Sequence, residues 1–292
     1  MPIHPLILAT GLAACLLPGF AAGAQGQASR PRTESPSMES VAHLQDYQVV
    51  EFRRYVTTHG QRGTFVRYFD SYFPEAFEQL GAMVFGQFTE RDDPDRFTWI
   101  RGFRDINARP VVNAAFYYGP LWREHRGKVN AILPDSDNVM LMRPLHPRQG
   151  ITVLPAVDPV VEAGGAQGVV VAQVFAVLKG SEEAFAARAE QAFSAYEADG
   201  VHAAGVLVSL NVPNNFPQLP IREDGPWLVW LGIARDNTTV QRVLGPKMDG
   251  VERALGDSGL VRGPVERLVM DPTPRSRLRW LDIDAPGGEE AP

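Results

Sequence analysis

The chain has 292 residues, of which 45% are hydrophobic and 21% are charged. This composition is typical of a packed globular protein and excludes a chain that is disordered throughout. The formal net charge is −6, and lysine and arginine form no long run. These features argue against a nucleic-acid-binding protein, because such proteins cluster positive charge on one face. The length is sufficient for one large domain or for two of ordinary size.

The first segment has the pattern of a signal peptide. Residues 5–22 are almost wholly apolar, and the small residues Ala22-Gly23-Ala24 follow them. The apolar run is short for a membrane span and is interrupted by glycine and proline. We therefore expect residues 1–24 to be cleaved, which predicts a periplasmic or secreted protein with no stable membrane span. A permanent anchor or a start codon assigned too early is the alternative, since no lysine or arginine precedes Arg30.

Cys15 is the single cysteine of the chain. It ends the sequence LAAC, which resembles a bacterial lipobox, so a lipoprotein anchored through Cys15 is a second alternative. The apolar run continues past Cys15, which disfavours this alternative. Removal of the segment would exclude internal disulfides, zinc held by cysteine and a thiol nucleophile. Residues 25–45 are rich in serine, proline and glutamine, and we expect them to be a flexible leader.

The segment 46–147 alternates between strand and helix patterns. Its helices are predicted to break near Pro74 and near Gly119-Pro120, because proline interrupts helical hydrogen bonding. The order is β-α-β-β-α-β, which is the ferredoxin-like pattern. Strands are expected at 47–57, 83–90, 96–103 and 139–142, helices at 60–80 and 109–131, and a turn at 135–138.

Several segments of this half resemble the NIPSNAP family. They are EFRRY, VFGQF, FTWIRGF, AFYYGPLWREHR and DSDNVMLMRPL, which cover nearly all of residues 47–145 in the order of that family. The resemblance implies ferredoxin-like units that pair into dimeric α/β barrels. The family has no agreed catalytic residues, so the resemblance implies no particular reaction.

The same order of elements recurs in the second half. Residues 148–167 are rich in proline, glycine and alanine and are expected to be a linker. The sequence WLGIARD at 230–236 matches WIRGFRD at 99–105, which indicates a divergent tandem repeat. We predict an α+β fold in which two tandem ferredoxin-like units form a pseudo-dimeric α/β barrel.

The second unit is expected to occupy residues 168–282, and a disordered tail is expected at 283–292. Its strands are predicted at 169–177, 205–210, 226–234 and 265–270, and its helices from 181 and over 238–255. The segment between Leu210 and Pro226 contains three prolines, so it is predicted to be an ordered loop or lid.

Charged and aromatic side chains share one face of the first sheet, because alternate residues of a strand point the same way. These candidate site residues are Glu51, Arg53, Tyr55, Trp99 and Arg101. The aligned positions of the second half are Val171, Gln173, Phe175, Trp230 and Gly232, so every charge is gone. If the two faces line the barrel, one end of the barrel is polar and the other is apolar.

The charged face has two interpretations. Buried charges cost free energy unless they are paired, so a Glu51–Arg101 or Glu51–Arg53 ion pair that stabilises the barrel is one of them. The other is a pocket in which Arg53 or Arg101 holds an anionic or carbonyl group beside Tyr55 and Trp99. Direct ion pairing without a cavity would favour the first, and an open cavity that reaches Tyr55 or Trp99 would favour a small apolar or anionic ligand.

The histidines form no metal-binding motif, and we expect neither a metal nor a cofactor. His125 lies among charged residues and is expected on the surface of its helix. Chlorite-dismutase-like proteins share the tandem plan and hold haem through a histidine of the second half. Only His202 is present in that half, at a helix–strand turn, so haem is not expected.

The sequence does not identify a reaction, and whether the chain is an enzyme stays open. We expect a secreted NIPSNAP-like protein that acts as a small-molecule-binding or protein-interaction module, with homo-oligomers left open. The alternative is a cofactor-independent monooxygenase or isomerase, which rests on analogy of fold alone.

Overall fold

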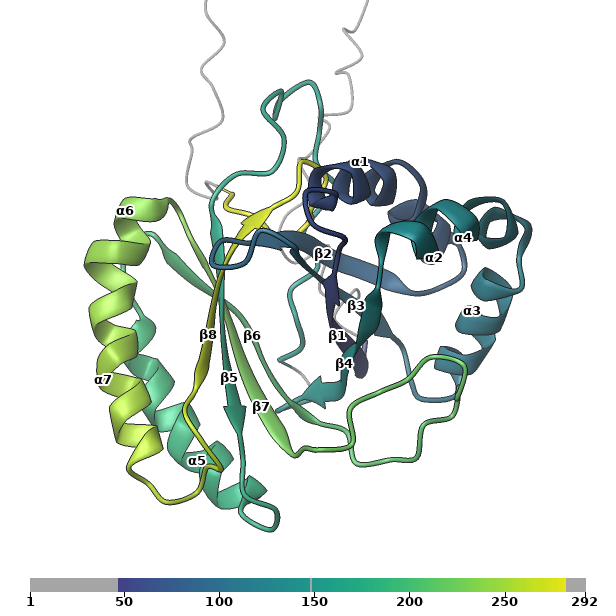
Figure 1. Ribbon diagram of the computed structural model, residues 1–292. Helices are drawn as coiled ribbons and strands as arrows, with labels where there is room; N and C mark the ends of the chain where they lie inside the picture. The colour runs from purple at the N-terminus through teal and green to yellow at the C-terminus, as the bar shows by residue number, and fades with distance from the viewer. Residues whose placement is uncertain (1–46, 148, 282–292) are drawn as a thin grey trace, which may run out of the picture. The chain divides into compact units, whose positions relative to one another are not determined.

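The computed structural model describes residues 47–147 and 149–281. Within them, eight antiparallel strands close into a barrel in the order β1-β3-β2-β8-β5-β7-β6-β4 (Figure 1). The strands are β1 (Val49–Val56), β2 (Met83–Glu90), β3 (Arg96–Phe103), β4 (Asp135–Pro144), β5 (Val169–Ala176), β6 (Val201–Ser209), β7 (Trp227–Ala234) and β8 (Glu266–Pro272). The predicted α+β class agrees with this architecture. The predicted signal peptide, leader and tail lie outside the described residues.

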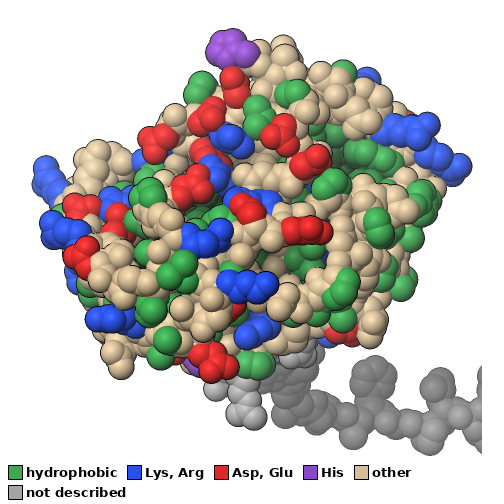
Figure 2. All heavy atoms as spheres, turned by 60° about the horizontal axis from the view of Figure 1, so that its bottom comes forward, with side chains coloured by type: hydrophobic (Ala, Val, Ile, Leu, Met, Phe, Trp, Pro, Cys, Tyr) green, Lys and Arg blue, Asp and Glu red, His purple; other side chains and the backbone are tan. Residues whose placement is uncertain are grey.

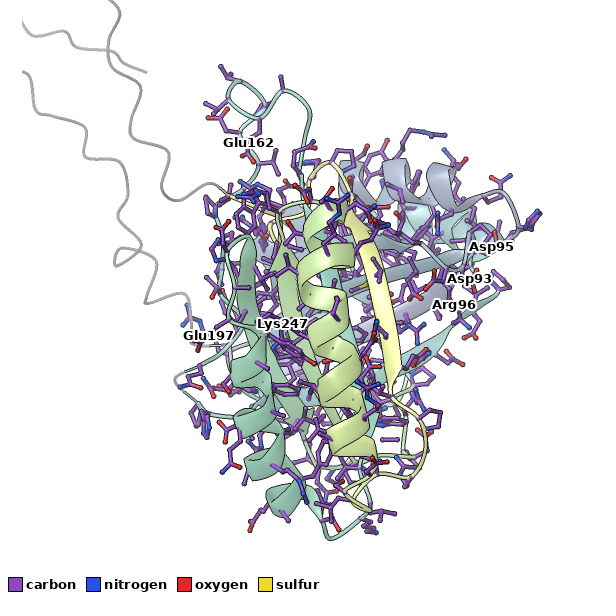
Figure 3. All side chains as sticks on the ribbon, turned by 90° about the vertical axis from the view of Figure 1, so that its left-hand side faces the viewer. Asp93, Asp95, Arg96, Glu162, Glu197 and Lys247 are labelled. Carbon is purple, nitrogen blue, oxygen red and sulfur yellow. The ribbon has the colours of Figure 1, made fainter. Side chains whose placement is uncertain are left out.

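Helices cover the outer faces of both halves of the barrel. Those of the first half are α1 (Arg62–Tyr72), α2 (Pro74–Gln79), α3 (Ala108–Tyr117) and α4 (Pro120–Ile132). Those of the second half are α5 (Glu182–Phe193), the short α6 (Asn237–Thr239) and α7 (Gly245–Gly256). Figure 3 shows α5 and α7 lying across the strands of the second half. No helix in 47–147 or 149–281 is long and apolar enough to cross a membrane.

The barrel consists of two four-stranded sheets with the same order. The first is β4-β1-β3-β2 and the second is β8-β5-β7-β6. They join at two short seams, where Thr89 pairs with Asp271 and Arg143 pairs with Val208. Closure at both seams leaves neither sheet with an unpaired edge, which removes a route to aggregation.

Apolar side chains from both halves fill the barrel. Val50 and Phe52 of β1 belong to the same buried cluster as Val170 and Ala172 of β5. Because side chains alternate along a strand, the residues between them point outward, toward the helices. Glu51 and its neighbours therefore lie between the sheet and the helices. The condition under which the barrel would have one polar and one apolar end is therefore not met.

The segment predicted as a linker contributes to the core. Ile151, Val153 and Leu154 belong to the cluster that fills the barrel. The proline- and glycine-rich composition of this segment concealed these apolar residues. The segment therefore does more than connect the two halves, since it also packs inside the fold.

Most predicted elements are observed, with two shifted boundaries. Prolines begin α2 and α4, as the predicted breaks near Pro74 and Pro120 require. Strand β4 begins at Asp135, where a turn was predicted, because it pairs with β1 across a bulge between Arg54 and Val56. Strand β6 begins at Val201, four residues earlier than predicted, and also contains a bulge.

The acidic turn between β2 and β3 is a solvent-facing hairpin (Figure 3). Arg62 Nη1 donates to the carbonyl oxygens of Glu90 and Asp93, at 2.7 and 2.6 Å. Asp95 accepts from the backbone N–H of Gly60 at 3.2 Å. These contacts explain the acids of this turn as local structure. On the face shown in Figure 2, positive and negative side chains are interspersed, and no continuous positive stripe is visible there.

We expect the two halves to unfold together, because they share one apolar interior. The Phe52→Ala variant should lower the free energy of unfolding by about 3–5 kcal/mol, since it leaves a cavity inside the barrel. Val111→Ala is the control, because Val111 is 68% exposed and its truncation should change stability by less than about 0.5 kcal/mol. Chemical denaturation followed by circular dichroism measures both. Two separated transitions in the wild type would contradict a shared core.

Candidate functional site

A single carboxylate on β1 holds three arginines. Glu51 is completely buried, and its Oε2 lies 2.7 Å from both Arg53 Nη1 and Arg101 Nε. Its Oε1 accepts from Arg109 Nε at 2.6 Å. Arg101 stands directly opposite Glu51 in the β1–β3 register, and Arg109 reaches the cluster from the start of α3. We call these four residues the arginine cluster.

The arginine cluster keeps Glu51 ionised. Burial alone would raise the pKa of Glu51, but the positive charges of Arg101, Arg53 and Arg109 outweigh it. The pKa therefore lies well below the usual value of 4.5. One carboxylate against three guanidinium groups leaves the cluster with surplus positive charge.

Aromatic rings offset part of this surplus. The Arg101 guanidinium lies 4.7 Å from the centre of the Phe77 ring and 5.1 Å from that of Trp99. The Arg53 guanidinium lies 5.5 Å from the Trp99 ring. The negative faces of aromatic rings attract cations, most strongly where water is excluded. The aromatic residues of this half therefore stabilise the buried guanidinium groups in addition to packing in the apolar core.

Several buried donors of the cluster lack a partner among the described residues. They include Arg101 Nη1, Arg109 Nη2, Trp99 Nε1 and the side-chain amide of Asn113. Buried polar groups in folded proteins are nearly always hydrogen-bonded. Arg101 and Arg109 of the cluster, and Trp99 and Asn113 beside it, therefore keep side-chain donors that no other described residue accepts.

A loop from the second half contacts the arginine cluster. Arg109 Nη1 donates to the side-chain oxygens of Asn214 and Asn215, each at 2.9 Å. These asparagines belong to the segment between β6 and β7 that was predicted to be an ordered loop. Asn215 Nδ2 also donates to the carbonyl oxygen of Ile106 at 2.6 Å. Phe216 then extends toward the rings of α3, 6.4 Å from the centre of Tyr117.

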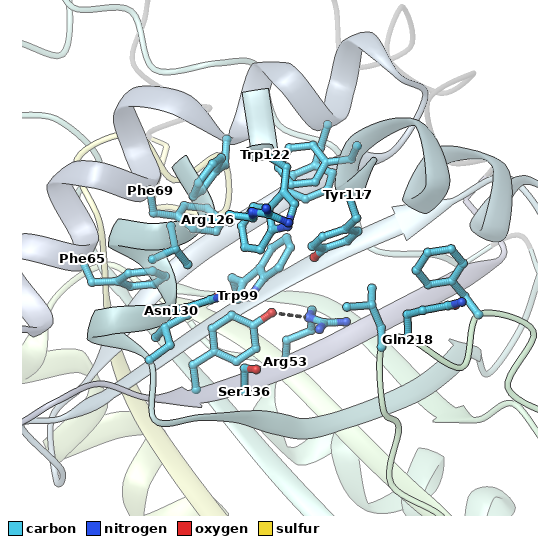
Figure 4. Close-up of a pocket in the computed structure, with 18 of the residues that line it drawn as sticks. Arg53, Phe65, Phe69, Trp99, Tyr117, Trp122, Arg126, Asn130, Ser136 and Gln218 are labelled. Atoms are coloured by element: carbon cyan, nitrogen blue, oxygen red, sulfur yellow. Dashed lines mark hydrogen bonds between the residues drawn. The ribbon is translucent and has the colours of Figure 1, made fainter. Parts of the chain in front are cut away.

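This loop borders a cavity of about 390 Å³ between the first sheet and its helices (Figure 4). Arg53 lies at its floor, and Arg126, Asn130 and Gln218 lie around it in Figure 4. Its walls are mainly aromatic and include Phe69, Phe77, Trp99, Phe116, Tyr117, Trp122 and Phe216. The described lining contains neither a carboxylate nor a histidine.

The floor of the cavity presents two hydrogen-bond donors. Arg53 Nε donates to the hydroxyl of Tyr55 at 2.7 Å, as drawn in Figure 4, which leaves the phenolic proton of Tyr55 free to donate. Arg53 Nη2 has no hydrogen-bond partner in the described part of the chain. Burial raises the pKa of Tyr55, so its hydroxyl stays protonated at neutral pH. The pair is suited to an acceptor oxygen, either carbonyl or anionic.

The five candidate residues lie together, in two layers. Arg53, Tyr55 and Trp99 line the cavity, whereas Glu51 and Arg101 form the ion pair behind it. The structural and ligand-binding interpretations therefore describe two parts of one site. Ligand binding itself stays a prediction.

Sequence analysis missed Arg109 and the two asparagines. They arrive from a helix start and from a loop more than a hundred residues away, so strand periodicity carried no signal for them. Only the two adjacent asparagines in a proline-rich loop, PNNFP, marked this segment as unusual.

The expectation that His125 lies on the surface is wrong. It is buried on the face of α4 that packs against α1, where the Tyr68 hydroxyl contacts its Nδ1 and the Tyr72 ring centre lies 4.2 Å away. The charged neighbours Arg123, Glu124 and Arg126 are exposed, whereas His125 is not. His202 is exposed and stacks 4.3 Å from the Trp280 ring. No group of three or more metal-ligating side chains occurs within the residues that the structure describes.

In the second half, the arginine cluster is replaced by a network centred on Gln173, in which Glu252 is paired with Arg267. The Tyr196 hydroxyl donates to Gln173 Oε1 at 2.5 Å, and Gln173 Nε2 donates to Glu252 Oε1 at 2.6 Å. The Tyr196 ring lies 4.5 Å from Trp230, the counterpart of Trp99. The fold therefore does not depend on charge at these strand positions.

No family model and no curated protein matches this chain. Among solved structures, a putative monooxygenase from Fusobacterium nucleatum is 12% identical over 80% of this chain and 96% of its own, with a TM-score of 0.52. A putative monooxygenase from Lactobacillus acidophilus is 13% identical over 80% of this chain and 97% of its own, with a TM-score of 0.49. A NIPSNAP family protein of unknown function from Agrobacterium tumefaciens is 17% identical over 34% of this chain and 89% of its own, with a TM-score of 0.32.

These comparisons concern the fold. At 12% identity, the likeness to the Fusobacterium nucleatum protein shows a shared barrel and carries no reaction over to this chain. The other two TM-scores are too low to add to that conclusion. The chain thus has the dimeric α/β barrel type of fold, and any function has to be argued from the site.

We expect Glu51→Gln to be strongly destabilising, because it leaves three buried guanidinium groups without a carboxylate. The loss should be about 3–5 kcal/mol at pH 7, measured by chemical denaturation. Glu266→Gln is the control, since its side chain is 49% exposed and its bond to Arg54 should contribute at most about 1 kcal/mol.

The free energy of unfolding should also depend on pH differently in the wild type and in Glu51→Gln. Because the folded pKa of Glu51 is depressed, its contribution is fully present above the unfolded value of 4.5 and is lost as the pH falls below it. The wild type should therefore lose stability faster than Glu51→Gln on acidification from pH 5 to pH 3. Parallel curves for the two proteins would show that the pKa of Glu51 is not depressed in the folded state.

Proposed function

We propose that this chain is a secreted NIPSNAP-like protein that binds a small, flat aromatic molecule in the cavity above Arg53. The aromatic cavity with two polar donors at its floor is the observation that carries this proposal. Ligand sites typically have volumes of about 300–1,000 Å³, apolar walls and a few convergent polar groups. The cavity of about 390 Å³ has these properties.

The tandem arrangement, the likeness to the NIPSNAP family and secretion each have separate support. Both sheets have the strand order 4-1-3-2, and WLGIARD aligns with WIRGFRD, which supports two tandem ferredoxin-like units arranged as a pseudo-dimer. The segments that resemble the NIPSNAP family lie between the start of β1 and the region just after β4, on strands and on the helices α3 and α4. Secretion is supported by the apolar run 5–22 and the small residues Ala22-Gly23-Ala24.

The lining favours binding over catalysis. A cofactor-independent monooxygenase or isomerase has to remove a proton from its substrate, which requires a base within hydrogen-bonding reach. At the floor, the described lining offers Arg53 and Tyr55, and the pKa of each is raised, so neither is a base at neutral pH. The floor could stabilise a developing negative charge on a bound carbonyl, but the lining provides no carboxylate or histidine to generate it.

Isothermal titration calorimetry with naphthalene-2-carboxamide tests the proposal. We expect saturable binding at one site per chain, because the naphthalene ring fits between the aromatic walls. Ser136→Trp should weaken binding at least tenfold, since Ser136 lines the cavity and the indole would fill it. Ser71→Trp is the matched control, because Ser71 is exposed on α1 and does not line the cavity.

Two results would contradict the proposal. Equal affinity of Ser136→Trp and wild type would show that the probe binds elsewhere. No binding to the wild type by the carboxamide or by the corresponding carboxylate would exclude an aromatic-binding cavity. Native mass spectrometry of the purified chain provides a second measurement, in which a retained small molecule should be displaced by the probe.

A further inference from the structure

We infer that the cavity selects aromatic carboxylates, and that the carboxylate binds between Arg53 Nη2 and the Tyr55 hydroxyl. This inference rests on the proposed function of the cavity and adds the charge of its ligand.

The arginine cluster has too few carboxylates for its arginines. Arg53, Arg101 and Arg109 are each at most 1% exposed, and all three bond to the one carboxylate of Glu51. Both oxygens of Glu51 are already engaged. Uncompensated charge in a water-poor interior is costly, so a bound anion would stabilise the cluster.

The loop that contacts the cluster adds no negative charge. Arg109 Nη1 bonds to two asparagine oxygens, those of Asn214 and Asn215, at positions where aspartate would have neutralised it. The contact with the second half therefore leaves the surplus positive charge of the arginine cluster unchanged.

The second half shows that the surplus is not a requirement of the barrel. The positions aligned with Glu51, Arg53 and Arg101 hold Val171, Gln173 and Gly232. Gln173 bonds to Tyr196 and to Glu252, and Arg267 balances the charge of Glu252. The same fold is thus built there from uncharged strand positions. Charge in the first half serves a purpose other than barrel formation.

The positions of Arg53 and Tyr55 at the floor of the cavity indicate where the anion would bind. Of the three arginines bonded to Glu51, Arg53 alone is among the described residues that line the cavity. Its Nη2 has no partner among the residues that the structure describes, and the adjacent Tyr55 hydroxyl has a proton to donate, so two donors are available for the two oxygens of a carboxylate. Trp99 packs against Arg53 and forms the wall on which an aromatic ring would lie. Arg101 and Arg109, behind the floor, add positive potential.

A matched pair of probes tests the inference on the wild-type protein. Naphthalene-2-carboxylate and naphthalene-2-carboxamide have the same ring and nearly the same size, and they differ in charge. At pH 7.5 we expect the carboxylate to bind at least tenfold more tightly by isothermal titration calorimetry. The preference should persist at 0.3 M NaCl, because buried charges are screened much less than exposed ones.

Single-residue variants test which side chains bind the carboxylate of the probe. Arg53→Gln should reduce the preference to less than threefold, because the carboxylate loses more affinity than the carboxamide when the positive charge is removed. Tyr55→Phe should reduce the preference in part, and it keeps the fold measurable if Arg53→Gln does not fold. Arg123→Gln is the control, since Arg123 is exposed on α4 outside the cavity lining.

Each outcome separates the two proposals. Equal affinity for carboxylate and carboxamide would overturn the charge selection and leave the aromatic-binding cavity intact. Loss of the preference in Arg126→Gln but not in Tyr55→Phe or Arg53→Gln would overturn the placement at the floor, since Arg126 lies elsewhere in the lining. Failure of both probes to bind would overturn the proposed function itself.

Discussion

The bond between one buried carboxylate and three guanidinium groups determines the arrangement of the first half of this protein. Glu51 connects β1 to β3 through Arg101 and β1 to α3 through Arg109. It also holds Arg53 in an orientation that presents one nitrogen to the cavity. Without Glu51, these arginines would repel one another in a region with little water. The position of α3 and the shape of the cavity floor both follow from this interaction.

The interior of the closed barrel stabilises the fold, whereas the outer faces of its sheets carry the residues that differ between the halves. The interior is apolar and receives side chains from both halves and from the linker, so it can stabilise the fold without any charged residue. The outer faces of the two sheets are then free to differ. One carries the arginine cluster and an aromatic cavity, whereas the other carries Gln173 and Tyr196 beside a Glu252–Arg267 ion pair.

The cavity depends on both halves although its charges come from one. Its aromatic walls are on the first sheet and helices, but Phe216, Gln218 and Leu219 come from the loop after β6. The same loop supplies the asparagines that hold Arg109. A chain that ended after β4 would lack this loop as well as the partner strands of its sheet. The tandem arrangement thus completes the site in addition to closing the barrel.

The sequence by itself determined the order of the elements, the breaks at Pro74 and Pro120, and the shared face of Glu51, Arg53, Tyr55, Trp99 and Arg101. These follow from local rules, because alternation along strands and the backbone of proline act over a few residues. The comparison of the two halves also identified the loss of charge from the sequence alone.

Tertiary structure decided which side of the sheet that face occupies and which distant residues complete it. Alternation assigns residues to a common face but does not say whether the face points into the barrel or toward the helices. Arg109, Asn214 and the buried His125 owe their places to the packing of helices and loops on the sheet. Their contacts span dozens of residues or more and depend on the global fold, so no local pattern in the sequence encodes them.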